Sequence, residues 1–159
     1  MIVTLADLPD IRAKHRKQKI VLGGGAFDIF HQGHIDYLRD IKTLGDILVI
    51  AIKSDAEIRS YKDADHPVQN EDVRAAVLDA IRYVDYVVIA PEGEEGDVEP
   101  PRLAVARILK PNLLVSINPK WRAHEKELAE FGTELKIMPI EKVNSTTSII
   151  ERIKSGGEG

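Results

Sequence analysis

Short runs of apolar residues recur along the chain, separated by longer segments in which apolar and polar residues repeat with helical spacing. A continuous apolar run of about four to eight residues is typical of a parallel strand that is buried on both faces. Such runs predict strands at residues 19–22, 47–52, 86–89, 113–117 and 135–138. Apolar positions three and four residues apart predict amphipathic helices at residues 4–17, 33–44, 70–83, 101–109, 122–131 and 145–154.

Strands and helices alternate in this prediction, and alternation indicates an α/β fold. We expect a five-stranded parallel sheet with helices on both faces, joined by right-handed crossovers. Ligands of such sheets bind beyond the carboxyl ends of the strands, where the strand order reverses. We expect one domain over residues 1–154 and a disordered tail at residues 155–159.

Composition narrows the class of protein. The 159 residues are 43% hydrophobic, enough for one domain with a real core, and the net charge is −4. An acidic balance argues against a general nucleic-acid-binding surface. The absence of cysteine excludes disulfides and thiolate chemistry. No apolar run is long enough to span a bilayer, and charged residues near the start of the chain interrupt the apolar segment that a signal peptide would need. We therefore expect no membrane segment and a cytoplasmic location.

The most informative segment is residues 24–35, Gly-Gly-Ala-Phe-Asp-Ile-Phe-His-Gln-Gly-His-Ile. It joins the first predicted strand to a helix, and a helix N-terminus after a glycine turn favours an anion through unpaired backbone N–H groups and the helix dipole. His31 and His34 are three residues apart on one face of that helix, where the anion would lie. Gly33 between them lets a ligand approach the backbone.

Two familiar phosphate loops do not fit this segment. The Gly-Lys-Ser/Thr of a Walker A loop is absent, and the glycines fail the G-x-G-x-x-G spacing of a dinucleotide site. What remains is G-x-F-D-x-x-H-x-G-H, made by Gly25, Phe27, Asp28, His31, Gly33 and His34. The alternatives are a histidine that only caps the helix and a zinc site built on the two histidines, for which no cysteine is available.

This pattern resembles the HxGH nucleotidyltransferases of the cytidylyltransferase-like group, and Ser145, Thr146 and Thr147 resemble their second motif, S-T-T-x-I. The resemblance covers nearly the whole chain. It implies a Rossmann-like nucleotidyltransferase fold, Mg2+ as cofactor and a homodimer. It also implies a reaction between a nucleoside triphosphate and a phosphorylated small molecule that releases pyrophosphate.

The resemblance also implies roles for single residues. His31, His34 and Lys62 would act on the phosphates, with a solvated surface lysine as the alternative for Lys62. Arg74 would hold phosphate or nucleotide, with a surface ion pair as the alternative, and Phe27 is also a candidate for core packing. The remaining nucleotide-binding candidates share the two motif turns: Gly24, Gly25, Ala26, Phe27, Asp28, Gly33, Ser145, Thr146 and Thr147. An ordinary helix cap is the alternative for the last three.

The acceptor is less defined. The likeness is closest to the nucleotidyltransferase half of bifunctional heptose-phosphate enzymes, which act on heptose 1-phosphate, with glycerol-3-phosphate cytidylyltransferase next. Residues 116–121 depart from both, because Lys120 stands where an acidic residue is expected. Asn118, Lys120, Trp121 and, more weakly, Asp55 are acceptor candidates, and Lys120 favours an anionic acceptor. FAD synthesis, a non-enzymatic nucleotide sensor, and the choice between ATP and CTP stay open.

Overall fold

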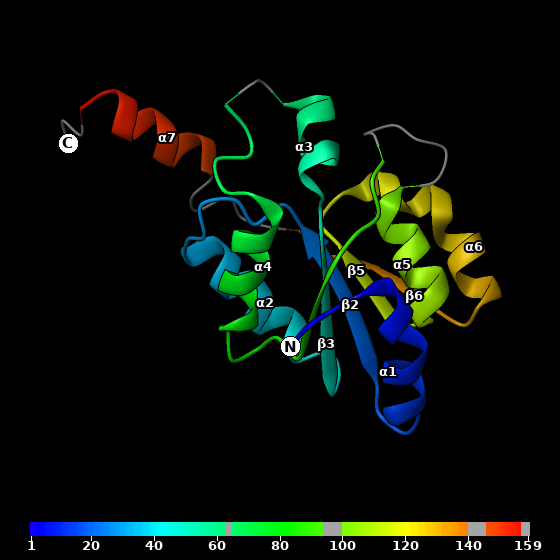
Figure 1. The fold of residues 1–159 in the computed structure, drawn as a ribbon. Coiled ribbons are helices and arrows are strands. Elements are labelled where there is room, and N and C mark those ends of the chain that lie inside the picture. The colour runs from blue at the N-terminus through cyan, green and yellow to red at the C-terminus, as the bar shows by residue number, and fades with distance from the viewer. Residues whose placement is uncertain (63–64, 94–99, 140–145, 157–159) are drawn as a thin grey trace.

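The computed structural model describes residues 1–62, 65–93, 100–139 and 146–156. Its sheet is made of β1 (Ile2–Val3), β2 (Ile20–Gly25), β3 (Ile47–Ile52), β4 (Tyr86–Ile89), β5 (Leu113–Ser116) and β6 (Glu134–Ile137). The helices are α1 (Leu8–Lys14), α2 (Gln32–Lys42), α3 (Asp55–Tyr61), α4 (Glu71–Asp79), α5 (Pro101–Leu109), α6 (Glu125–Glu130) and α7 (Thr146–Lys154), with short 3-10 turns η1 (Leu5–Asp7) and η2 (Pro119–His124). The predicted α/β class is confirmed, and Figure 1 shows the arrangement.

The sheet has six parallel strands in the order β1-β4-β3-β2-β5-β6, so the prediction of five strands was wrong by one. The additional strand, β1, is only two residues long and pairs with β4 at the edge of the sheet. Two residues carry no periodicity, and for this reason the pattern of the sequence did not reveal it. Two predicted helices also differ, since residues 4–17 form η1 and α1, and residues 122–131 form the end of η2 and the short α6.

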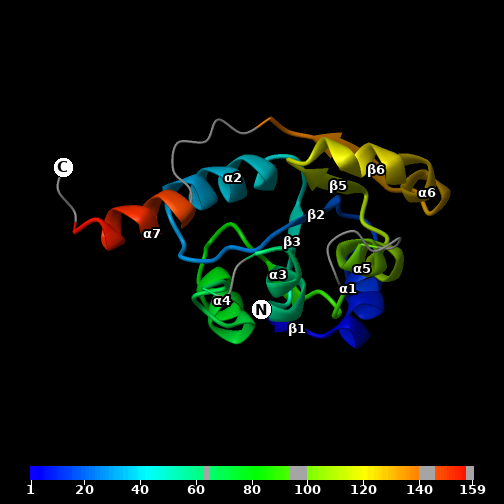
Figure 2. The same cartoon turned by 90° about the horizontal axis from the view of Figure 1, so that it is seen from above.

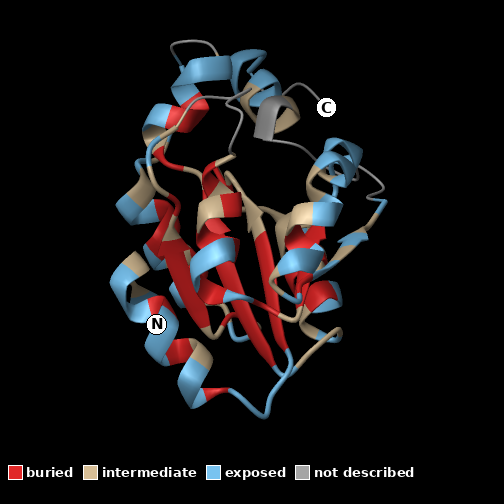
Figure 3. Cartoon of the chain, turned by 90° about the vertical axis from the view of Figure 1, so that its right-hand side faces the viewer, coloured by how far each residue is buried: buried red, intermediate tan, exposed pale blue. Residues whose placement is uncertain are grey.

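Helices cover both faces of the sheet (Figure 2). Leu8, Leu103 and Leu128 bring α1, α5 and α6 into one apolar core. Leu38 and Leu78 bring α2 and α4 into a second core on the other face. Every residue of β3 is buried, as Figure 3 shows for the central strands, and burying each large aliphatic side chain contributes about 1.5–3 kcal/mol.

The strand order places the site. The chain leaves β2 toward β3 and β4, and later returns to β5 on the other side of β2, so the order reverses between β2 and β5. The helix that follows β2 is α2, whereas α5 precedes β5 on the opposite face. The carboxyl ends of β2 and β5 therefore form a crevice with helices from both faces at its edges.

Among the described residues, no helix is long and apolar enough to cross a membrane. The predicted tail begins with Ser155 and Gly156, which continue from α7, and residues 157–159 lie outside the described part. Helix α7 lies at the upper left of Figure 1, above α2 and on the side of the carboxyl ends of the strands.

Candidate active site

The turn between β2 and α2 is held in an unusual backbone conformation. Phe27 and Ile29 have φ angles of 54° and 46°, which residues with a side chain rarely adopt and which are least favourable for a β-branched residue. Phe27 is 3% exposed, and its ring packs 5.2 Å from that of His34 and 6.3 Å from that of Tyr37. Phe27 is thus a core residue whose ring packs against the ring of His34. Strain of this kind, held by packing, is typical of functional turns.

His31 and His34 cap helix α2 with their own side chains. The backbone N–H of Gly33 donates to Nδ1 of His31 at 3.1 Å, and the backbone N–H of His31 donates to Nδ1 of His34 at 3.4 Å. Because Nδ1 accepts in both rings, these hydrogen bonds assign the ring proton to Nε2. The rings stack with centroids 3.9 Å apart, so the two Nε2–H groups form a pair of donors at the helix start.

This cap changes how the helix start can bind an anion. The sequence predicted unpaired backbone N–H groups there, but the amides of Gly33 and His34 already donate to His31, through its ring and its carbonyl oxygen. The imidazole Nε2–H groups and the helix dipole remain to attract an anion. The histidine cap, offered as an alternative to an anion site, is therefore compatible with one, because it engages Nδ1 of each ring and leaves Nε2–H as the donor.

The histidines are uncharged near neutral pH. Burial lowers the pKa of His31. Burial, together with the neighbouring His31, lowers the pKa of His34 to about 4, and the charge of Asp28 opposes this only in part. A bound polyphosphate would favour the protonated rings and raise both pKa values. The pair can therefore supply two neutral N–H donors at the start of α2.

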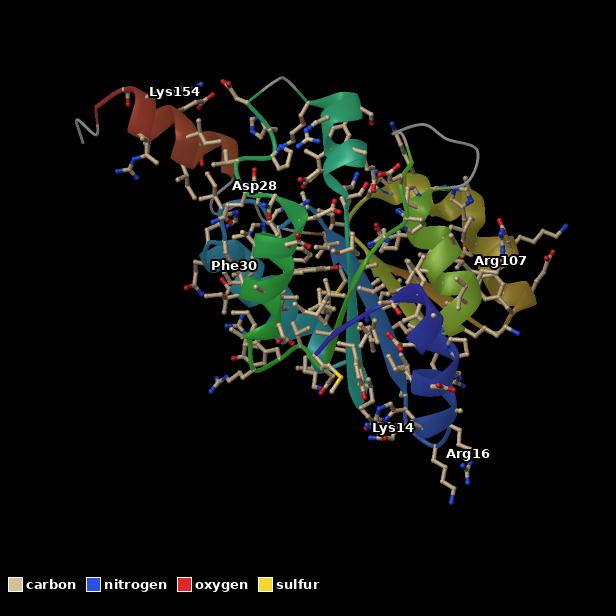
Figure 4. All side chains as sticks on the ribbon, viewed as in Figure 1. Lys14, Arg16, Asp28, Phe30, Arg107 and Lys154 are labelled. Carbon is tan, nitrogen blue, oxygen red and sulfur yellow. The ribbon has the colours of Figure 1, made fainter. Side chains whose placement is uncertain are left out.

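Asp28 fastens the turn to the segment after α3. Its carboxylate oxygens accept from the backbone N–H groups of Val68 at 2.8 Å and Gln69 at 3.0 Å, and the side chain is 3% exposed. Figure 4 shows Asp28 near the beginning of α4, at the carboxyl edge of the sheet. This geometry assigns Asp28 to positioning the histidine turn.

Arg74 lies beneath the site and does not line it. Its side chain is fully buried and donates to the carbonyl oxygens of Ala26 (2.6 Å), Lys53 (2.9 Å) and Gln69 (3.0 Å), and to the carboxylate of Asp55 (2.7 Å). These acceptors belong to the turns after β2 and β3 and to the segment before α4. Arg74 and Asp55 thus form an ion pair that ties these three turns together, and neither residue lines the cavity described below.

A cavity of about 480 Å³ opens at the carboxyl end of β2. Residues 24–26 form one wall, and η2 with the end of β5 forms another. The predicted acceptor residues Asn118, Lys120 and Trp121 all line it, as do Gly24, Gly25 and Ala26. The other lining residues are Ala51, Lys53, Glu57, Ala90, Pro100, Pro101, Arg102, Ser116, Ile117 and His124. His31, His34 and Asp55 are not among them.

Two basic residues of this cavity were missed from the sequence. Lys53 directly follows the buried strand β3, a position that parallel-sheet topology places at the site, so a signal was available. Its ammonium pairs with Glu57 at 2.8 Å and lies 4.4 Å from the centre of the Tyr61 ring. Burial opposes its charge, but Glu57 and Tyr61 outweigh burial and raise the pKa of Lys53. Arg102 sits in the first turn of α5, where nothing in the local pattern distinguishes it.

The remaining predicted residues are placed less directly. Lys62 ends helix α3, where its backbone N–H donates to Ile58, and it does not line the cavity. Thr146 and Thr147 begin helix α7, and Ser145 lies outside the described residues. Lys14 and Arg16 lie at the opposite end of the molecule and add nothing to the charge of the site (Figure 4).

No cluster of three or more His, Asp or Glu side chains suited to a metal occurs within the described parts of the chain. The carboxylate nearest the histidine turn, Asp28, already accepts two backbone hydrogen bonds. These residues fit a magnesium ion that is carried mainly by substrate phosphates and water, as is common for this ion. A zinc site on the two histidines finds no third ligand among the described residues.

Comparison with known proteins shows the family to which the chain belongs. The chain matches the cytidylyltransferase-like family over residues 22–152. It is 40% identical over 141 residues to the bifunctional protein HldE of Helicobacter pylori and 39% identical over 148 residues to that of Vibrio cholerae. The alignments cover 89% and 91% of this chain but 29% and 30% of the two relatives, so the chain spans about 30% of their length.

Solved structures give the same fold. The lipopolysaccharide core biosynthesis protein from Thermoplasma volcanium aligns with a TM-score of 0.62 at 27% identity, over 80% of this chain and 99% of that one. The pantoate-beta-alanine ligase from Francisella tularensis aligns with a TM-score of 0.63 at 17% identity, over 100% of this chain and 78% of that one, and shows the fold alone. The family match and the HldE relatives confirm the resemblance to the cytidylyltransferase-like family.

Proposed function

The chain belongs to the cytidylyltransferase-like family of nucleotidyltransferases, and we propose that it transfers a nucleoside monophosphate from ATP or CTP to a phosphorylated sugar or polyol, releasing pyrophosphate. One observation carries the proposal. A pair of imidazole Nε2–H donors stands at the start of α2, and a basic cavity is lined by residues 24–26, where β2 ends before that helix. The turn therefore has room for two phosphorylated reactants.

The triphosphate would bind at the start of α2. The donors of His31 and His34 and the dipole of an eleven-residue helix favour its α- and β-phosphates there. Lys62 would close over the phosphates from the end of α3, as a flexible point charge. Ser145, Thr146 and Thr147 would complete the nucleotide site from the start of α7.

The reaction needs positioning more than acid–base chemistry. An oxygen of the acceptor phosphate attacks the α-phosphorus in line, the new P–O bond forms, and the bond to the bridging oxygen of pyrophosphate breaks with its electron pair on the leaving group. The attacking oxygen is already ionised, so no general base is required. The histidine pair stabilises charge on the phosphates as the transition state forms, and loss of one such donor typically costs about 10²–10³ in rate.

Magnesium fits this site as an ion held by the nucleotide phosphates. When bound, it would neutralise charge on the pyrophosphate group. The magnesium ion would not need a ligand from the protein. Asp28 can therefore keep its two backbone hydrogen bonds and continue to position the turn. We also propose a homodimer and a cytoplasmic location, both from the resemblance to the family.

The acceptor would occupy the cavity. Lys120 and Trp121 bring a positive charge and an aromatic face to its outer wall, and Asn118 adds an amide. Heptose 1-phosphate is the first candidate because of the resemblance to the heptose enzymes, and glycerol 3-phosphate, ribitol 5-phosphate and flavin mononucleotide test the alternatives. A site of this volume suits a small phosphorylated molecule.

The test is a pyrophosphate-release screen with magnesium. ATP and CTP are each combined with the four acceptors, using the wild-type protein, His34→Ala and, as a surface control, Arg82→Gln. We expect release with one pair, retained in the control and reduced by about 10²–10³ in His34→Ala. Binding of a triphosphate without release for any pair would contradict transfer to these acceptors and favour a nucleotide sensor.

A further inference from the structure

Two arginines lie near the carboxyl end of β2, and their surroundings differ: Arg74 is fully buried, whereas Arg102 is half-buried. Arg74 has a carboxylate and three carbonyl oxygens as partners, which satisfies both its charge and most of its donors. Arg102 donates to the hydroxyl of Ser116 at 3.0 Å and, weakly, to the carbonyl of Val115 at 3.5 Å. Within the described part of the chain, no carboxylate forms an ion pair with it.

A guanidinium that is partly removed from water destabilises the folded protein unless an anion pairs with it. Burial lowers the pKa of the Arg102 guanidinium, and nearby Tyr37 and Glu57 oppose this only in part. The group stays charged at any physiological pH. Charged groups that leave water are normally paired, and the fork of an arginine is matched by a carboxylate or a phosphate. Arg102 lines the cavity, so an anion that enters the cavity can reach it.

The surroundings hold the guanidinium at one place. It lies 4.3 Å from the centre of the Trp121 ring, in a cation–π contact. On the other side, a Cβ atom at Gly24 would stand 2.6 Å from its Cδ and 2.8 Å from its Nη1. The carbonyl oxygen of Ala51 would also stand 2.8 Å from that Cβ, so glycine at position 24 is required by the neighbouring strand, and it lets Arg102 lie close to the backbone there.

The other charges of the cavity also favour an anion. Lys53 and Lys120 add two ammonium groups, and Glu57, the acidic residue in the lining, is neutralised by its 2.8 Å contact with Lys53. The cavity thus keeps an excess of positive charge from Arg102 and Lys120 after this pair is counted. A phosphate monoester dianion would balance that excess.

We infer that Arg102 binds the phosphate of the acceptor and orients its attacking oxygen, so that this residue sets the specificity for phosphorylated acceptors. The inference rests on the proposed function. Arg102 is the acceptor-side partner of the histidines: it belongs to α5 on one face of the sheet, while His31 and His34 belong to α2 on the other. Arg102 lies against the backbone at Gly24. A phosphate bound to Arg102 would therefore lie near the carboxyl end of β2 and not at the mouth of the cavity.

The test compares Arg102→Gln and Arg102→Lys with Arg107→Gln, a control on the same helix whose side chain is exposed and paired with Glu127. Steady-state kinetics give KM for the acceptor and for the triphosphate separately. We expect Arg102→Gln to raise the acceptor KM by about 10- to 100-fold and Arg102→Lys by less, because a lysine keeps the charge but loses the fork. The triphosphate KM and the control should stay within about twofold.

A binding measurement keeps the inference testable without turnover. Inorganic phosphate is titrated calorimetrically into a His31→Ala, His34→Ala protein, which removes the histidine donors, with and without Arg102→Gln. We expect phosphate binding that weakens at least about tenfold in the Arg102 variant. Unchanged binding and an unchanged acceptor KM would overturn the inference, as would a rise in the triphosphate KM alone. Phosphate binding that depends on Arg102, in a protein that releases no pyrophosphate, would refute the proposed function and leave this anion site standing.

Discussion

Replacing Arg74 by methionine distinguishes a structural arginine from one that binds nucleotide. The change removes the donor of three carbonyl oxygens and the 2.7 Å partner of the Asp55 carboxylate, which keeps only a 3.6 Å contact with Arg59. Breaking a buried ion pair typically costs about 3–5 kcal/mol, and the orphaned carbonyls keep the cost from falling below that range. We therefore expect Arg74→Met to lower the free energy of unfolding by about 3–5 kcal/mol, a large share of the stability of a domain this size.

Urea denaturation followed by circular dichroism measures this loss, with the exposed Arg82→Met as the matched control, expected within about 0.5 kcal/mol of wild type. Arg74→Lys, which keeps the charge but cannot reach every acceptor, should lose about half as much. Adding Asp55→Asn to Arg74→Met removes the orphaned charge and should recover about 1–2 kcal/mol. A midpoint equal to that of wild type, with a raised KM for the triphosphate, would refute the reasoning and return Arg74 to the nucleotide site.

Two further predictions concern the histidine turn. The pKa of His34 is about 4 in the folded protein and about 6.5 when unfolded, so the unfolded chain takes up the proton first and stability falls as pH drops from about 6.5 to about 4. Because His34 is partly exposed, we expect a loss of about 1–2 kcal/mol over that window, seen as a urea midpoint that depends on pH less steeply in His34→Gln; equal slopes would contradict it. Asp28→Asn replaces one acceptor oxygen with a donor that faces a backbone N–H and should cost about 1–3 kcal/mol locally. Hydrogen exchange at the two amides that Asp28 binds should quicken while α1 stays protected, and unchanged exchange would rule out the positioning role.

The parts of the fold that were predictable are those governed by local pattern. The run at residues 47–52 is apolar throughout because β3 is covered on both faces, and alternation with amphipathic segments then indicates a parallel sheet. The histidine pair could also be predicted from the sequence, since the cap and the first turn of its helix lie within four residues of each other. In contrast, β1 is a strand only because β4 offers it an edge, and that edge is distant in the sequence.

The site shows the same division more sharply. The spacing that marks Arg74 is visible in the sequence, but its role depends on turns after two different strands that meet around its guanidinium. Whether an arginine faces ligand or backbone is decided by burial, which spacing does not encode. Arg102 is the opposite case, because an unremarkable helix position becomes the charged wall of the cavity once β5 lies beside β2.

The topology itself supplies what an in-line transfer needs. An in-line displacement requires the attacking and leaving oxygens on opposite sides of the α-phosphorus. Helices α2 and α5 reach the end of β2 from opposite faces of the sheet, because the strand order reverses between β2 and β5. In the proposed reaction, pyrophosphate leaves toward His31 and His34, while the acceptor phosphate enters from Arg102, with the glycine turn between them. The reversal of strand order thus accounts both for the position of the site and for the direction of the reaction across it.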